Sequence, residues 1–269
     1  MLNLSGKVAI VTGAGSVGPG WGNGRATATL LARQGASVML VDLVPAAVDA
    51  TFDTIVSEGN TCATHYCDML DSDSVKNMVD ACIDKFGRID ILVNNVGGSE
   101  PGDPVSMSEA AWDNQIDFNL KTVFLGCKHV LPFFIAQGHG AIVNLSSVAG
   151  LRNSKDRTHI GYSASKAGVM QFTKSLAGAY AKKGIRCNTV VPGLMHTPLV
   201  EHRLTKQLSA VDADSLIAKR NSMVPLGRMG TGWDVAHAVL FLVSDEANFI
   251  TGTDIVVDGG YTTFGPNAA

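Results

Sequence analysis

The sequence predicts an α/β fold, a Rossmann-like doubly wound parallel sheet of about seven strands with helices on both faces. Short apolar, β-branched runs such as Val8–Val11 alternate with amphipathic helical patterns along nearly the whole chain, as consecutive βαβ units do. Glycine or polar residues follow several of these runs directly, at the strand ends where such folds bind ligands. We find no linker or repeat, and we expect residues 1–269 to form a single domain.

Composition excludes several classes of function. A formal net charge of −3 gives no electrostatic reason to expect nucleic acid or an anionic membrane as a partner. No apolar run reaches the length of a membrane span, and a strand pattern begins at Lys7 without a signal peptide. The five cysteines are odd in number and lack metal-ligand spacing. We therefore expect reduced thiols, no metal site and a cytoplasmic location.

A glycine-rich stretch follows the first strand and contains a misleading motif. Residues 13–18 match G-x-G-x-x-G literally, but that motif requires a helix to begin at its third glycine. Gly18-Pro19-Gly20 cannot start a stable helix. We therefore assign only Gly13, as the tight exit from the strand, and Ser16 to the cofactor site from this part of the turn.

The phosphate-binding turn is expected later, at Gly22-Asn23-Gly24. The helical pattern begins at Arg25 and ends near Gly35, so the free amides at its start can face a pyrophosphate. An ordinary glycine-rich surface loop is the alternative interpretation.

The second strand, residues 37–42, ends in Asp42, with Leu43 beside it as a further cofactor contact. Asp42 lies 18 residues beyond Gly24, near the spacing of an acid that bonds the ribose hydroxyls of a dinucleotide. A 2′-phosphate would meet like charge there, and no basic residue adjoins Asp42 in the sequence. These residues predict NAD in preference to NADP.

The remaining patterns continue the alternation. We expect helices over residues 45–58, 72–86, 108–137, 162–183 and 234–243, and strands over 61–66, 89–93, 141–145, 185–191 and 254–257. Residues 194–225 lack strand character and carry two short helical patterns, which favours a lid over the substrate. Asn119 lies in the apolar stripe of its helix, where it either bonds a neighbouring carbonyl or interrupts the helix beside the active site.

Tyr162 and Lys166 form the candidate catalytic pair. Four residues apart on a helix, they lie one turn apart on the same face. A phenol has a pKa near ~10, and a fixed ammonium at ~4 Å is sufficient to lower it by about three units. The pair alone is weak, because tyrosine and lysine meet this way on many solvated helix faces.

Several motifs stand together in one order along the chain. They are Thr12-Gly13 with Gly22-x-Gly24, Asn94-Asn95-x-Gly97, Asn119, Ser147, Tyr162-x-x-x-Lys166 and Pro192-Gly193-x-x-x-Thr197. With this order the sequence resembles the short-chain dehydrogenase/reductases over nearly its whole length.

The resemblance implies catalytic roles. Tyr162 would be the acid/base, and Lys166 would lower its pKa, bond the nicotinamide ribose and start a proton relay through Asn119. Ser147 would bond the substrate oxygen. Ser146 competes for that role, and we prefer Ser147 because it directly precedes Val148-Ala149-Gly150, as in the family.

The resemblance also implies cofactor contacts. Asp68 and Met69 would flank the adenine, Asn95 and Gly97 would lie on the ribose side, and the carboxamide of nicotinamide would be held after Pro192-Gly193 by Met195 and Thr197. The family commonly forms dimers and tetramers through the helices expected at 108–137 and 161–183. We therefore expect a homotetramer.

Two departures from the family pattern concern loops. Residues 14–21 place eight residues between the first two motif glycines instead of three, and the extension is expected to cover the pyrophosphate or contact another subunit. The stretch from Ser147 to Tyr162 is two residues longer than usual. Its loop carries the basic residues Arg152, Lys155, Arg157 and His159, which either bind an anionic substrate group or are solvated.

Three functions are compatible with these residues. The leading one is an NAD-dependent oxidoreductase that interconverts a secondary alcohol, cyclic diol or hydroxy compound and a ketone. The second is an enoyl-thioester reductase, whose branch also lengthens the first turn but typically spaces its tyrosine and lysine further apart. The third is a non-catalytic NAD-binding regulatory module, which would not need the set Asn119, Ser147, Tyr162 and Lys166.

Overall fold

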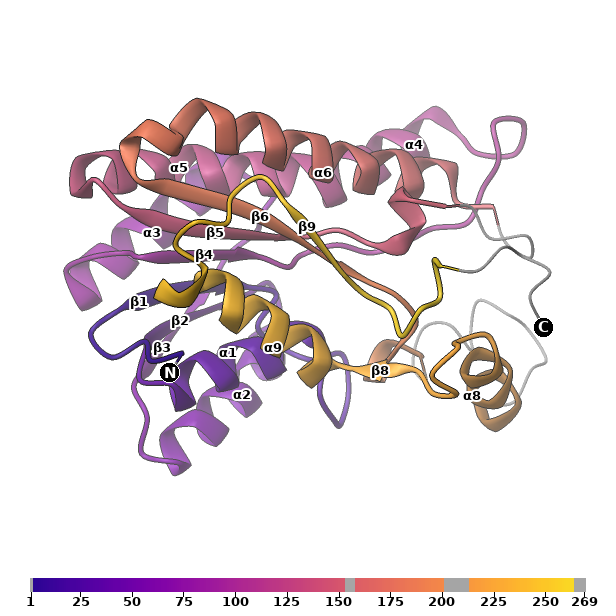
Figure 1. The fold of residues 1–269 in the computed structure, drawn as a ribbon, viewed down its shortest axis with the longest axis horizontal. Coiled ribbons are helices and arrows are strands. Elements are labelled where there is room, and N and C mark those ends of the chain that lie inside the picture. The colour runs from indigo at the N-terminus through magenta and orange to yellow at the C-terminus, as the bar shows by residue number, and fades with distance from the viewer. Residues whose placement is uncertain (1, 153–157, 201–212, 264–269) are drawn as a thin grey trace.

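The predicted parallel sheet is confirmed. The computed structural model describes residues 2–152, 158–200 and 213–263 (Figure 1). Seven strands pair in parallel in the order β3-β2-β1-β4-β5-β6-β9. They are β1 (Val8–Thr12), β2 (Ser37–Asp42), β3 (Cys62–Tyr66), β4 (Ile91–Asn94), β5 (Gly140–Leu145), β6 (Ile185–Pro192) and β9 (Asp254–Val257).

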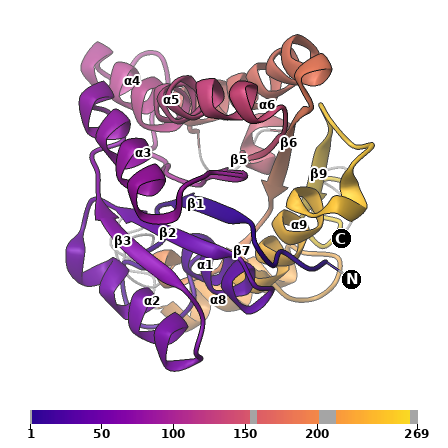
Figure 2. The ribbon, with the colours of Figure 1, turned by 90° about the vertical axis from the view of Figure 1, so that its left-hand side faces the viewer.

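Helices cover both faces of the sheet, as Figures 1 and 2 show. One layer contains α1 (Asn23–Arg33), α2 (Pro45–Ser57) and α9 (Gly232–Val243), and the other contains α3 (Ser72–Phe86), α4 (Glu109–Ile116), α5 (Thr122–Gln137) and α6 (Ile160–Tyr180). Each layer encloses its own cluster of buried apolar side chains, because strands covered on both faces contribute to two cores. None of the helices in these described ranges is long and apolar enough to cross a membrane.

The strand order reverses at β1, which pairs with β2 on one side and β4 on the other. In doubly wound sheets this reversal opens a crevice at the carboxyl ends of the strands. The carboxyl ends of β1, β2 and β4 are Thr12, Asp42 and Asn94, so the predicted strand-end residues meet at this crevice.

Element boundaries differ from the predictions in a few places. The first helix, α1, begins at Asn23 rather than Arg25. The helix expected over residues 108–137 is divided by a π-helical segment, η1 (Asp117–Lys121). The segment after β6 was expected to lack strand character, but β7 (Met195–His196) pairs with β8 (Gly230–Thr231). It also contains α8 (Ala213–Ser222), while residues 201–212 lie outside the described ranges.

Three short helical turns complete the described elements: η2 (Val148–Gly150), η3 (Ala181–Lys183) and η5 (Asp245–Ala247).

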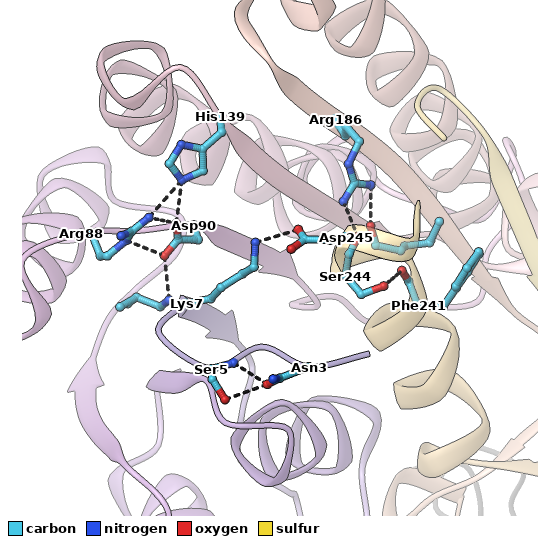
Figure 3. Close-up of polar contacts among 12 residues, drawn as sticks. Asn3, Ser5, Lys7, Arg88, Asp90, His139, Arg186, Phe241, Ser244 and Asp245 are labelled. Atoms are coloured by element: carbon cyan, nitrogen blue, oxygen red, sulfur yellow. Dashed lines mark hydrogen bonds and ion pairs between the residues drawn. The ribbon is translucent and has the colours of Figure 1, made fainter. Parts of the chain in front are cut away.

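A buried carboxylate joins the amino-terminal ends of central strands, on the side of the sheet opposite the crevice. Asp90, just before β4, accepts hydrogen bonds from Val8 N (2.8 Å) and Arg88 Nη2 (2.6 Å), and its Oδ1 lies 2.7 Å from His139 Nε2 (Figure 3). These contacts join the starts of β1, β4 and β5.

Candidate active site

Two adjoining cavities lie at the carboxyl ends of the strands. The first, about 870 Å³, is lined by the glycine-rich turn after β1 and by the residues that follow β2 and β3. The second, about 640 Å³, is lined by the residues after β5 and β6 and by the start of α6. Asn95, Gly97 and Leu199 line both. The volumes are typical of sites for small molecules and cofactors.

The glycine-rich turn packs closely against the first helix. A Cβ added to Gly24 would overlap the carbonyl oxygen of Gly13, and Gly13 itself has φ +63°. Asn95 fixes the same turn, since its Nδ2 donates to Thr12 O (3.2 Å) and Gly13 O (3.0 Å). Gly22 is the N-cap of α1. The absence of a side chain at Gly24 therefore brings the amino end of α1 against the strand exit, which is how a dinucleotide fold presents free amides to a phosphate.

Asp42 lies on the wall of the first cavity. Its Oδ2 accepts from Gly15 N (2.9 Å) and its Oδ1 from Val44 N (3.1 Å). These bonds fix the carboxylate at the end of β2, while leaving acceptor capacity on both oxygens. Arg25 also lines this cavity, but its guanidinium donates to Gly20 O (3.0 Å) and to Thr54 Oγ1 (3.1 Å).

The extension of the first turn packs within the chain. The rings of Trp21 and Trp233 have centroids 4.6 Å apart, and the guanidinium carbon of Arg25 lies 4.5 Å from the Trp21 centroid. A Cβ on Gly20 would lie 3.2 Å from Pro198, so the extension also contacts the segment after β7. Pro19 lines the first cavity. The extension thus forms part of the wall of the first cavity and is anchored on α9.

The two neighbouring serines after β5 have different surroundings. Ser146 is buried and its Oγ donates to the carbonyl oxygen of Lys166 (2.8 Å). Ser147 Oγ accepts from Ala149 N (3.2 Å), and a side-chain hydrogen bond joins Ser147 to Tyr162. Ser147 is therefore the serine whose hydroxyl meets the candidate acid/base.

Lys166 is buried beneath Tyr162. Its Nζ donates to the carbonyl oxygen of Leu145 (2.9 Å) and lies 5.8 Å from the Tyr162 ring centroid. Burial lowers the pKa of Lys166 to about 8, because removing an ammonium from water disfavours its charged form.

The pKa of Tyr162 shifts against expectation. Burial raises it, and the hydrogen bond with Ser147 lowers it by less. The expected depression by Lys166 is not found, since the lysine is bonded to Leu145 O and lies over the face of the ring. In this arrangement Tyr162 is a protonated phenol at neutral pH, and such a group can donate a proton.

Asn119 lies behind the second cavity, in the π-helical segment. Its Nδ2 donates to Gln115 O and Gly98 O (both 2.9 Å), and its Oδ1 accepts from Gly98 N (3.0 Å). Both interpretations of Asn119 thus describe the structure: it bonds neighbouring backbone groups and lies where the α-helix is interrupted. A Cβ on Gly97 would lie 2.7 Å from Asn119 Oδ1 and 2.9 Å from Lys166 Nζ, so these polar atoms border the same small space.

The cavities collect most residues that the sequence singled out. The first is lined by Gly13, Ser16, Asp42, Leu43, Asp68, Met69, Asn95 and Gly97. The second is lined by Asn23, Asn95, Gly97, Ser147, Tyr162, Lys166, Pro192, Gly193, Met195 and Thr197. Neither is lined by Gly22, Gly24 or Asn119. Those three shape the walls from behind.

Sequence reasoning missed some cavity residues. Tyr261 lines the second cavity and its carbonyl oxygen accepts from Arg152 Nη1 (2.6 Å). Its position after Gly259-Gly260, at the carboxyl end of the last strand, was an available signal. No pattern in the sequence marked Arg25 or Leu199. Of the basic loop, Arg152 and His159 line the cavity, whereas Lys155 and Arg157 lie outside the described residues.

Comparison with known proteins decides the family. A family model described as enoyl-(acyl carrier protein) reductase matches residues 19–262. A crystal structure of a short-chain dehydrogenase/reductase from Burkholderia xenovorans is 48% identical, with a TM-score of 0.90 over 97% of this chain and 98% of that one. This chain belongs to the short-chain dehydrogenase/reductase family.

Curated relatives of this dehydrogenase/reductase chain carry different activities. The 3-oxoacyl-(acyl-carrier-protein) reductase of Thermotoga maritima is 38% identical over 96% of this chain and 99% of its own. The cyclohexanol dehydrogenase of Acinetobacter sp. is 38% identical over 96% and 95%. The cis-4-hydroxycyclohexanecarboxylate dehydrogenase of Sinomonas cyclohexanicum is 40% identical over 95% and 96%. All are oxidoreductases by name, and family membership makes this chain an oxidoreductase with a nicotinamide cofactor.

Proposed function

We propose that this enzyme uses NAD to interconvert a secondary alcohol and a ketone, with Tyr162 as the acid/base. The observation that carries the proposal is that Ser147, Tyr162 and Lys166 line one cavity, in which Ser147 bonds Tyr162. That cavity adjoins the one that contains Asp42. The two relatives named for cyclohexane-ring alcohols favour a cyclic hydroxy compound as the substrate.

The residues fit a dinucleotide. Asp42 would bond the adenosine ribose, the amino end of α1 would face the pyrophosphate, and Met195 and Thr197 would lie at the nicotinamide. Asn23 Oδ1 is a buried oxygen that no donor among the described residues satisfies. Asn23 lines the second cavity, so a bound group with N–H donors would complete it. The cofactor supplies hydride transfer when bound.

Residues of the chain would transfer the proton to and from the substrate oxygen. Tyr162 takes the proton from the alcohol in oxidation and returns it to the ketone in reduction. Ser147 donates a hydrogen bond to the substrate oxygen and stabilises the charge that develops there. Lys166, held at the carbonyl of Leu145, would bond the nicotinamide ribose and start the proton relay through Asn119. The raised pKa of Tyr162 favours reduction near neutral pH and predicts that oxidation accelerates as pH rises.

The cofactor preference rests on Asp42 and has its own test. A 2′-phosphate would meet the carboxylate, while Arg25 is already bonded to Gly20 and Thr54. Titration of NADH and NADPH fluorescence should give at least about tenfold tighter binding of NADH, or about 1.4 kcal/mol. Asp42→Asn should reduce that ratio. Equal binding of both cofactors by the wild type would contradict the preference.

The decisive experiment is an oxidation screen over secondary alcohols, cyclic diols, sugars and hydroxy acids, with the matching ketones in reverse. Tyr162→Phe should lower kcat by about 10²–10⁴-fold while NADH still binds. Full turnover by that variant would refute the assignment. Absence of turnover on every substrate, with NADH bound, would favour the non-catalytic regulatory module.

An enoyl-thioester reductase is the second candidate, because the matching family model carries that description. The four-residue step from Tyr162 to Lys166 counts against it, since the resemblance implies a wider spacing in that branch. Supplying NADH with a ketone and, separately, with an enoyl thioester distinguishes the two. We expect turnover of the ketone alone.

Assembly and lid are further proposals. We propose a homotetramer formed through α4–α5 and α6, supported by partly exposed apolar side chains on α4 and α5, namely Trp112, Phe124 and Ile135. Light scattering after size-exclusion chromatography would test this.

We also propose that residues 194–225 act as the lid, since Leu199, Leu216 and Met223 line the second cavity. A cytoplasmic location remains part of the proposal.

A further inference from the structure

We propose that the substrate carries a carboxylate, bound by Arg152 on one wall of the second cavity and by Lys219 and Arg220 on another. This inference rests on the proposed function, because the carboxylate would occupy the cavity that contains Ser147 and Tyr162. It assigns a charge to the substrate, which the catalytic residues do not specify.

Arg152 is held in a fixed position at the cavity. It follows the short turn η2 and lines the cavity five residues after Ser147. Its Nη1 donates to Tyr261 O (2.6 Å), and its guanidinium carbon lies 5.0 Å from the Tyr261 ring centroid. A planar guanidinium that is already stacked and bonded to the chain loses little entropy when it also binds a carboxylate.

Lys219 and Arg220 reach the same cavity from α8. Both line it together with Leu216 of the same helix, which is buried. Arg220 Nε lies 3.3 Å from Met229 Sδ, so its guanidinium contacts the residue that precedes β8. Basic residues in a last helical turn are common, since they complement the helix dipole. That explanation does not apply to Arg152, which belongs to no helix.

The charge balance around the cavity is positive. No aspartate or glutamate is among the described residues that line it. The lysines and arginines that line it are Arg152, Lys166, Lys219 and Arg220, whereas the whole chain has 21 lysines and arginines against 24 aspartates and glutamates. Arg152, Lys219 and Arg220 each have other interactions in the chain. This local excess of positive charge draws an anion toward the cavity.

The test measures ligand binding to the enzyme–NADH complex, which does not require turnover. NADH fluorescence is titrated with pairs of a carboxylate and its uncharged carboxamide on three skeletons: cyclohexane, benzene and a straight six-carbon chain. For at least one skeleton the acid should bind about tenfold tighter or more, and added salt should reduce this preference. Each variant is scored by the same acid-to-amide ratio.

The variants locate the preference. Arg152→Gln should reduce the acid-to-amide ratio about tenfold. Arg152→Lys should retain part of the ratio, because it keeps the positive charge but loses the planar guanidinium that binds a carboxylate through two N–H groups. The double variant Lys219→Gln/Arg220→Gln provides an independent test on the other wall. Lys76→Gln, an exposed lysine of α3 that lines neither cavity, is the matched control and should keep the wild-type ratio.

The outcomes separate the two proposals. Normal NADH binding and turnover of an uncharged alcohol, without acid preference on any skeleton, would reject the carboxylate site alone. A preference that persists in both Arg152→Gln and the double variant would also reject it. Failure of NADH to bind, or of every alcohol and ketone to react, would reject the proposed function and this inference with it.

Discussion

Asn119 and the backbone of Gly98 bond each other twice. Gly98 N donates to Asn119 Oδ1 at 3.0 Å, and Asn119 Nδ2 donates back to Gly98 O at 2.9 Å. The same Nδ2 also donates to Gln115 O at 2.9 Å. One fully buried side chain therefore fixes the loop after β4 against the π-helical segment, and this places Gly97 between the two cavities.

Replacing Asn119 by alanine should destabilise the protein by about 3 kcal/mol. It would leave the N–H and C=O of Gly98 without their partner, and each buried group left unsatisfied costs roughly 1–3 kcal/mol. Urea denaturation measures the change. Asn114→Ala, at an exposed position one turn earlier, should change the free energy of unfolding by less than about 0.5 kcal/mol. Equal effects of the two substitutions would contradict the role given to Asn119.

Ser146 and Ser147 should respond differently to substitution by alanine. Ser147→Ala should lower kcat about 10²-fold or more, because the substrate oxygen would lose its hydrogen-bond donor. Ser146→Ala should chiefly lower the free energy of unfolding, by about 1 kcal/mol, since Lys166 O would lose its donor. Steady-state kinetics and urea denaturation on both variants check this. A larger kinetic defect in Ser146→Ala would reverse the assignment.

The sequence predicted the sheet and the strand-end residues because local patterns determine both. Asp42 ends one buried strand and Asn95 follows another, and parallel strands bring their carboxyl ends to the same side of the sheet. The choice of Ser147 over Ser146 came from the resemblance, and the structure adds the physical difference, a buried bond from Ser146 to Lys166 O.

Features that depend on packing between distant residues were not predictable. The contact of Arg152 with Tyr261 joins positions 109 residues apart, and the β7–β8 pair is too short to leave a periodic pattern. The pKa of Tyr162 was predicted in the wrong direction, because its burial and the bond of Lys166 to Leu145 O are tertiary features. The position of a charge, not its presence in the sequence, determines such a shift.

Asp90→Ala should weaken folding without altering catalysis. Burial alone would raise the pKa of Asp90, but hydrogen bonds from Arg88, His139 and Val8 N lower it overall. Removing the carboxylate should cost about 3 kcal/mol, as for other buried charges that lose their partners. Asp90 lies at the amino-terminal end of β4, whereas the cavities lie at the carboxyl ends of the strands. KM and kcat should therefore stay near wild type.

The pH dependence of this variant gives a second check. The folded-state pKa of Asp90 lies below the unfolded value of about 4. Its stabilisation is therefore present above pH ~4 and is lost as pH falls through the folded-state pKa. Urea denaturation between pH 7 and pH 3 should show the difference between wild type and variant shrinking toward acid. A constant difference across that range would contradict the shift.

Lys166→Met should abolish turnover and yet stabilise the protein near pH 7. The pKa of Lys166 is about 8 in the folded chain and about 10.4 in an unfolded one, so the buried ammonium costs roughly 3 kcal/mol at neutral pH. Methionine removes that cost, while the lost bond to Leu145 O costs about 1 kcal/mol. The free energy of unfolding should therefore rise by about 2 kcal/mol at pH 7.

The sign of this effect can be followed with pH. Between pH 8 and pH ~10 the unfolded wild type binds one proton more than the folded form, so wild-type stability increases with pH in that window. The variant lacks this increase, and its advantage should disappear by about pH 10. Urea denaturation at pH 7 and pH 10 measures both values, with Lys182→Met, an exposed lysine beyond α6, as the control. A variant less stable than wild type at pH 7 would show that the buried ammonium stabilises the fold, and the cost assigned to it would be wrong.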